Sequence, residues 1–112
     1  MLEIALHESA DEEFKAAIRF YESRLTGLGN TFYGRVSEAL DLVLAQPFAD
    51  QVVSDNYRRC LIRQFPYSIV YRVESDRIYV LAVAPLESQA GLLENTELTK
   101  NARSQNRFLR RR

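Results

Sequence analysis

Two runs of alternating residues, joined by a short connection that contains Pro66, constrain this fold more than any other feature. In the first run Tyr57, Arg59, Leu61 and Arg63 alternate with Arg58, Cys60, Ile62 and Gln64; in the second run Tyr67, Ile69, Tyr71 and Val73 alternate with Ser68, Val70, Arg72 and Glu74. A period of two residues is typical of strands that present one face to a core. The sequence therefore predicts a β-hairpin over residues 57–74.

The same hairpin is unusually rich in arginine and tyrosine, and it gives the candidate binding residues. We expect a cationic, aromatic-rich sheet edge that suits a polyanion or an acidic peptide. The candidates are Arg58, Arg59, Arg63, Arg72, Tyr67 and Tyr71. The alternative is that the arginines only solvate the sheet and the tyrosines only pack within it. For Tyr71 packing is favoured, because its spacing places it on the apolar face with Ile69 and Val73.

The remaining pattern predicts an α+β fold of one domain, residues 1–85, followed by a tail, residues 86–112. We expect strands over residues 2–7, 57–64, 67–74 and 77–84 and a first helix over residues 10–25. A second helix is expected after the break at residues 27–29 and before Pro47, followed by a loop over residues 48–56. The order β-α-α-β-β-β places an antiparallel helical hairpin on one face of a small, mainly antiparallel sheet. In the tail we expect a short helix, then a disordered end with five arginines between residues 103 and 112.

Short sequence patterns predict where the two helices begin and where the second one ends. Ser9 with Glu12 three residues later resembles a capping box, so Ser9 is the expected N-cap of the first helix. Asn30 or Thr31 is the expected cap of the second helix, after the break at residues 27–29. Pro47 ends that helix, because the residue before a proline is driven out of helical geometry. The apolar stripe of the second helix runs through Leu28, Phe32, Val36, Leu40, Val43 and Leu44.

Charge and cysteine content narrow the function classes. Net charge is zero, but residues 1–56 hold four basic and ten acidic residues, whereas residues 57–112 hold eleven basic and five acidic ones. This asymmetry is consistent with an acidic partner or nucleic acid on the C-terminal half, and equally with arginines that serve only solubility. The lone Cys60 excludes an internal disulfide and indicates the reducing cytoplasm. No apolar run reaches the ~20 residues that span a bilayer, so we expect no membrane partner and no signal peptide.

Taken in order, several of these segments resemble the RelE/ParE toxin superfamily of bacterial type II toxin–antitoxin systems. The resembling pieces are residues 20–22, 27–29, Phe32, residues 36–40, Pro47, Arg58 with Arg59, residues 65–73 and residues 80–84. The likeness is greatest to the ParE-like, plasmid-stabilisation branch. It implies a cognate acidic antitoxin as partner, and it leaves open whether the chain also forms a homodimer.

The sequence departs from that family after the last strand. Pro85 stands where relatives usually carry a histidine, residues 87–89 stand in place of arginines, and Leu92 with Leu93 replaces an aromatic pair. An mRNA-cleaving relative needs a general acid or base as well as cations. We therefore predict no catalytic residue, and with one cysteine and His7 as the only histidine we predict no metal site and no cofactor.

Three functions remain open at this point. The leading hypothesis is a ParE-like toxin that inhibits DNA gyrase by binding. The second is a ribosome-dependent mRNA endoribonuclease of the RelE type, in which the arginines hold the phosphate. The third is a degenerate toxin that has lost its activity and only binds the antitoxin.

Overall fold

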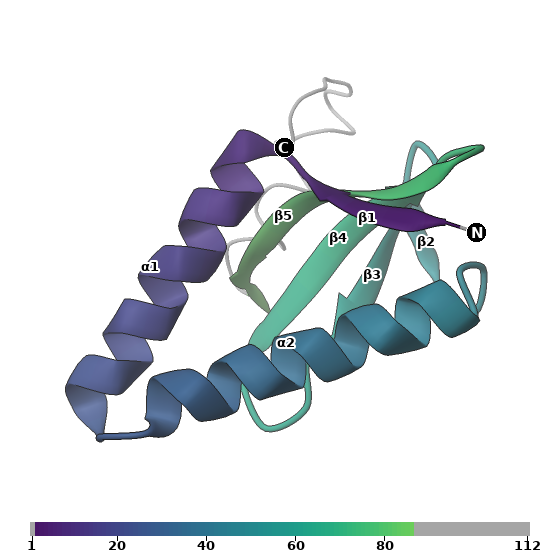
Figure 1. Ribbon diagram of the computed structural model, residues 1–112. Coiled ribbons are helices and arrows are strands. Elements are labelled where there is room, and N and C mark those ends of the chain that lie inside the picture. The colour runs from purple at the N-terminus through teal and green to yellow at the C-terminus, as the bar shows by residue number, and fades with distance from the viewer. Residues whose placement is uncertain (1, 87–112) are drawn as a thin grey trace.

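The computed structural model describes residues 2–86, which form two helices packed on one face of a five-stranded sheet (Figure 1). The elements are β1 (Glu3–Leu6), α1 (Glu8–Arg24), α2 (Leu28–Ala45), β2 (Val52–Ser54), β3 (Tyr57–Leu61), β4 (Tyr67–Val73) and β5 (Arg77–Pro85). The α+β class and the expected order are confirmed, with one strand more than predicted. The expected tail helix and basic end lie outside the described residues, and so do the substituted positions 87–89, 92 and 93.

The sheet is mixed, with strand order β1-β5-β4-β3-β2. β1 pairs with β5 in parallel, from Glu3 opposite Arg77 to Leu6 opposite Val80, and the other neighbours are antiparallel. In register, Cys60, Ile69 and Val83 lie side by side facing the helices, and the neighbouring row of Arg59, Val70 and Ala82 therefore lies on the second face.

The additional strand β2 falls in the segment expected to be a loop. Ser54 pairs with Tyr57, so the connection is the two residues Asp55 and Asn56, both with positive φ (43° and 71°). Two positive φ angles in a two-residue loop are the mark of a type I′ hairpin turn, for which Asp and Asn are well suited. β3 is also shorter than expected, because residues 62–66 form the turn to β4, with Gln64 at φ 77°.

The first helix begins differently from the prediction. Its N-cap is His7, not Ser9, because the His7 ring nitrogen Nδ1 accepts the Ser9 backbone N–H at 3.0 Å. Ser9 lies inside the first turn, where its hydroxyl is 2.8 Å from the same nitrogen. His7 thus has a capping role in the fold.

The start of the second helix is held by a residue of the first. α2 begins at Leu28, and neither Asn30 nor Thr31 caps it. Instead the two carboxylate oxygens of Glu22 accept the backbone N–H groups of Gly27 (2.9 Å) and Gly29 (3.0 Å). Gly27 takes φ 91°, and a Cβ on Gly29 would stand 2.7 Å from the Ile18 carbonyl oxygen. The glycines therefore permit a tight turn and a close helix contact.

The helices meet at this turn and spread apart from it, rather than remaining an antiparallel pair along their length (Figure 1). α1 packs against β5 and β1, and α2 packs against β3 and β1. Among the described residues, no helix is long and apolar enough to cross a membrane.

The core is centred on Phe32, which is fully buried. Its ring lies 5.0 to 5.2 Å, centroid to centroid, from the rings of Tyr21, Phe65 and Tyr67. These four rings come from α1, α2, the β3–β4 turn and β4. One residue therefore joins both helices to the sheet, and aromatic pairs add ~0.5–1.5 kcal/mol each beyond the area that they bury.

We predict that Phe32→Ala lowers the free energy of unfolding by roughly 3–5 kcal/mol, because it removes a buried aromatic ring. Chemical denaturation measures this loss, with Tyr33→Ala as the matched control, since Tyr33 is 52% exposed. A loss below about 1 kcal/mol for Phe32→Ala would mean that α2 is not docked on the sheet as described.

Candidate partner-binding site

The six residues predicted to bind a partner do not form one surface. Arg59 and Arg72 are diagonal neighbours on the second face of the sheet, whereas Arg58 and Tyr71 are paired on the face toward the helices. Arg63 lies in the turn after β3, and Tyr67 reaches the aromatic core. The expected single cationic sheet edge is therefore divided among several places with different surroundings.

Tyr71 and Arg58 hold the loop that follows α2. Tyr71 is fully buried, and its hydroxyl donates toward the Asp50 carboxylate (2.9 Å) and the Pro47 carbonyl oxygen (3.2 Å). Burial, together with the hydrogen bond to Asp50, raises the pKa of Tyr71. The Arg58 guanidinium donates to the carbonyl oxygens of Phe48 and Asp50. These two side chains therefore hold the loop in position.

Arg63 and Arg72 each form an ion pair with a carboxylate of the same chain. The Arg63 guanidinium lies 3.0 Å from the Glu38 carboxylate of α2, which also pairs with Arg35 at 3.3 Å. Because Arg63 is 67% exposed, this pair contributes at most ~1 kcal/mol and leaves the arginine accessible.

The Arg72 side chain is held by both carboxylate and ring contacts. Its Nε donates to Glu74 at 2.9 Å, and its charge lies 5.3 Å and 5.6 Å from the ring centres of Tyr57 and Tyr79. Hydrogen bonds from Arg77 and from Arg72 lower the pKa of Glu74. Arg72 is therefore a fixed element of this face.

Arg59 differs from the other three arginines. Among the described residues its guanidinium makes no hydrogen bond, ion pair or ring contact, and it lines a groove of about 430 Å³ between α2, the loop after it and β3. We call this the Arg59 groove; its lining residues are Leu42, Ala49, Asp50, Gln51, Val53, Arg59, Cys60 and Leu61. Leu42 and Leu61 are 60% and 62% exposed. Exposed leucines beside a free cation are suited to an amphipathic, acidic peptide.

Two residues of the sequence, Leu42 and Leu61, gave a signal for this groove, but they were not among the predicted binding residues. Leu42 lies outside the apolar stripe of α2, and Leu61 stands between two arginines on the polar side of its strand. One exposed leucine alone would mean little, but both line the same groove, and apolar residues gathered in one place often mark a binding surface. β2, which supplies Val53, could only be found through its turn.

For catalysis the described residues offer little. His7 caps α1 and packs edge-on against Tyr79, with ring centres 6.2 Å apart. Within residues 2–86, no group of three or more His, Cys, Asp or Glu side chains could hold a metal ion.

Comparison with known proteins places this fold in a family. The family model for the ParE toxin of the type II toxin–antitoxin system, parDE, matches residues 4–88. The match covers most of the chain, and the chain therefore belongs to the ParE toxin family. No curated protein matches the sequence significantly.

Two solved structures share the fold. A chain of a chromosomal ParDE TA system from P. aeruginosa is 18% identical with a TM-score of 0.64, and the match covers 76% of this chain and 96% of that one. A copper-bound mutant toxin from Helicobacter pylori is 22% identical with a TM-score of 0.55, covering 79% of this chain and 98% of that one. At such identities the likeness shows the fold alone.

The cysteine in the floor of the groove gives a test of its packing. Cys60 is 6% exposed, and burial beside Asp50 raises the pKa of its thiol to about 11. Because only the thiolate reacts, alkylation of the native protein at pH 8 should be at least ~100-fold slower than in denaturant. Iodoacetamide labelling followed by mass spectrometry measures both rates.

A double variant, Cys60→Ser with Ser75→Cys, moves the cysteine to an exposed turn and should react at the same rate in both states. Rapid labelling of Cys60 in the native protein would show that the groove floor opens readily.

Proposed function

We propose that this protein is the toxin of a type II toxin–antitoxin pair, neutralised in the cytoplasm by an acidic antitoxin, and that it inhibits DNA gyrase by binding rather than by catalysis. The observation that carries the proposal is the match of the ParE toxin family over residues 4–88. The departure from nuclease-type residues after β5 adds support, since Pro85 occupies the position where relatives usually carry a histidine.

The Arg59 groove supports an acidic antitoxin as the partner. A partner carboxylate would gain a hydrogen bond and an ion pair from Arg59 without displacing an internal acid, because this guanidinium has no partner among residues 2–86. An apolar partner side chain placed between Leu42 and Leu61 would remove both leucines from water, at ~25 cal/mol per Å² of apolar surface. Arg63, in the turn after β3, adds a second accessible positive charge.

Tyr67 lies on the opposite side of β4 from the Arg59 groove, so any contribution that it makes to partner binding is at another place. Arg58 and Tyr71 act through the loop at residues 47–50, whose position sets the shape of the groove wall. Arg72 presents a charge already balanced by Glu74. In this assignment Arg59 and Arg63 make direct charge contact at the groove, whereas Arg58 and Tyr71 act through the loop.

Charge reversal tests the groove. We predict that Arg59→Glu weakens binding of the antitoxin encoded beside this gene by about tenfold or more, and that adding Arg63→Glu weakens it further. Calorimetry at several salt concentrations measures the affinity, which should fall as salt rises because exposed charges are screened beyond ~8–10 Å.

The matched control is Arg19→Glu, which makes the same charge change on an exposed part of α1, away from the groove. If Arg19→Glu and Arg59→Glu lowered the affinity equally, the loss would reflect the overall charge of the protein and not a contact at the groove. Binding that changes neither with salt nor with Arg59→Glu would show that the Arg59 groove is not part of the interface.

The target is tested by two assays with purified toxin. We expect loss of gyrase supercoiling activity and no cleavage of a message during translation, as read by primer extension. General acid–base assistance is commonly worth ~10²–10⁴-fold, so a chain without it should cut only at background level.

Codon-positioned cuts would overturn the gyrase assignment in favour of the endoribonuclease. Silence in both assays, with antitoxin binding retained, would instead identify a degenerate toxin. Antitoxin added in equimolar amount should restore supercoiling, which controls for non-specific inhibition.

A further inference from the structure

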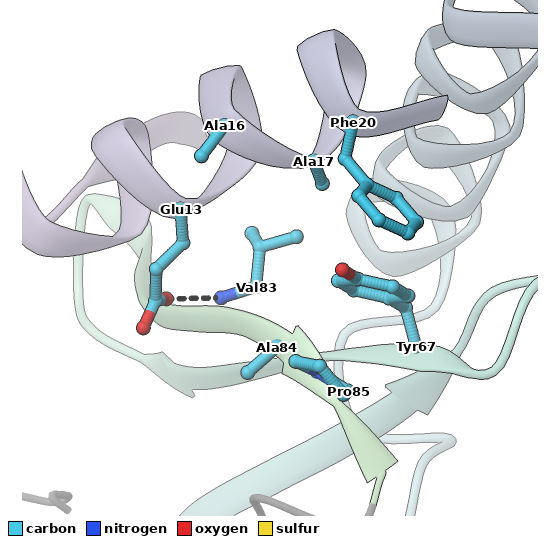
Figure 2. A pocket seen from close by; sticks show the side chains of 8 residues that line it. All are labelled: Glu13, Ala16, Ala17, Phe20, Tyr67, Val83, Ala84 and Pro85. Atoms are coloured by element: carbon cyan, nitrogen blue, oxygen red, sulfur yellow. Dashed lines mark hydrogen bonds between the residues drawn. The ribbon is translucent and has the colours of Figure 1, made fainter. Parts of the chain in front are cut away.

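A second hollow lies toward the other edge of the sheet, between α1 and the end of β5. It has a volume of about 360 Å³, and we call it the Glu13 cleft. Figure 2 shows the Glu13 carboxylate at one end and the rings of Phe20 and Tyr67 at the other, with Val83 and Pro85 along the strand between them.

The cleft exists because β1 is shorter than the strand it pairs with. Pairing ends where Leu6 meets Val80, after which the His7 backbone N–H donates to the Val80 carbonyl oxygen at 2.8 Å. β5 continues to Pro85, and no other strand of residues 2–86 pairs with it on that side. The Val83 N–H faces this open edge, and Oε1 of Glu13 accepts it at 3.0 Å (Figure 2). A carboxylate thus occupies an edge that would otherwise offer a backbone donor.

The second carboxylate oxygen is the informative atom. Oε2 of Glu13 makes no hydrogen bond or ion pair with any described residue. Glu13 as a whole is exposed, yet its carboxyl group lies close enough to protein atoms for desolvation to raise its pKa, opposed by the hydrogen bond from Val83. A negative charge that is partly desolvated and has one free oxygen gains most from a cation brought to it.

The residues that line the Glu13 cleft indicate which chemical group would precede the cation in a ligand. Apart from Glu13 and the hydroxyl of Tyr67, the cleft is lined by Ala16, Ala17, Phe20, Val83, Ala84 and Pro85. Phe20 is 46% exposed, and the Arg24 guanidinium already lies 4.7 Å from its ring centre, so this ring takes part in a cation–π contact within the chain. An apolar passage with aromatic rings and a carboxylate matches an alkyl stem that ends in a cation.

We propose that the Glu13 cleft is a binding pocket for a lysine or arginine side chain of the antitoxin, with the stem between Phe20 and Pro85 and the cationic head on Oε2 of Glu13. The identity of the partner rests on the proposed function, whereas the preference of the cleft for a cation does not. A neutral side chain would desolvate the carboxylate without pairing it, and an acidic one would be repelled. Tyr67, predicted to bind a partner, has its place in this cleft.

The cleft itself is tested without any antitoxin. n-Butylguanidinium is titrated into the ¹⁵N-labelled protein, and the amide signal of Val83 reports on the carboxylate that accepts its hydrogen bond. We expect a saturable shift in the native protein and at least tenfold weaker binding to Glu13→Gln, whose amide oxygen can still accept the Val83 N–H. n-Butanol has the same stem without charge and should bind at least tenfold more weakly.

Glu12→Gln is the matched control, because Glu12 is an exposed neighbour on α1 that does not line the cleft. It should bind the guanidinium as the native protein does. Equal binding of the alcohol and the guanidinium, or unchanged binding to Glu13→Gln, would overturn the assignment of the cleft to a cation.

The partner is tested with the antitoxin from the adjacent gene. Glu13→Gln should lower its affinity about tenfold, and Glu12→Gln should leave it unchanged. If the guanidinium binds but antitoxin affinity does not respond to Glu13→Gln, the basic side chain does not come from the antitoxin and this proposal fails. If the antitoxin does not bind even the native protein, the proposed function fails, while the guanidinium titration still decides the nature of the cleft.

Discussion

The packing around Phe32 is the interaction on which the rest of the structure depends. Its ring is in contact distance of three other rings, from α1, the β3–β4 turn and β4, so one side chain of α2 fixes both helices against the sheet. The turn between the helices strengthens this arrangement through Glu22, which bonds the first N–H groups of α2. From that point the helices spread apart. α2 thereby forms one wall of the Arg59 groove, and α1 forms one wall of the Glu13 cleft.

Charge pairing within the fold explains why so few of the arginines remain available. The N-terminal half of the sequence is acidic and the C-terminal half basic, and folding brings members of the two halves together, as Glu38 and Arg63 show. Within the C-terminal half, Glu74 binds both Arg72 and Arg77. The sequence asymmetry is therefore reduced in three dimensions. Among the described residues, the groups that keep unused charge include the Arg59 guanidinium and the second carboxylate oxygen of Glu13, which lie toward opposite edges of the sheet.

Hydrophobic periodicity was enough to predict both helices and four of the five strands, because these elements bury one face each. It missed β2, whose three residues carry no periodic pattern; only the Asp55–Asn56 turn indicated it. The helix caps were also mispredicted, since Glu22 and His7 act through side-chain geometry that a capping-box pattern does not describe. Tyr71 illustrates the limit for the site: alternation placed it correctly on the apolar face, but Asp50, its hydrogen-bond partner, is 21 residues away in sequence.

The Arg59 groove and the Glu13 cleft could not be predicted from hydrophobic periodicity, because each depends on where a strand ends. β2 covers only the first residues of β3, which leaves Leu61 beside the groove, and β1 stops before Val83. Such mismatches in strand length follow from tertiary packing. Glu13, three residues after Ala10 on the same helix, looks in sequence like one more exposed acid of a first turn.

Together the two proposals require that one partner, the antitoxin, binds both the Arg59 groove and the Glu13 cleft. An amide chemical-shift map of the ¹⁵N-labelled toxin in complex with the antitoxin from the adjacent gene tests it most directly. If the antitoxin occupies both hollows, the largest shifts fall on residues 59–61 and on Val83, and the exposed turn at Ser75 and Asp76 stays unchanged. Shifts that avoid both hollows, and gather on another surface of the helices or sheet, would contradict it.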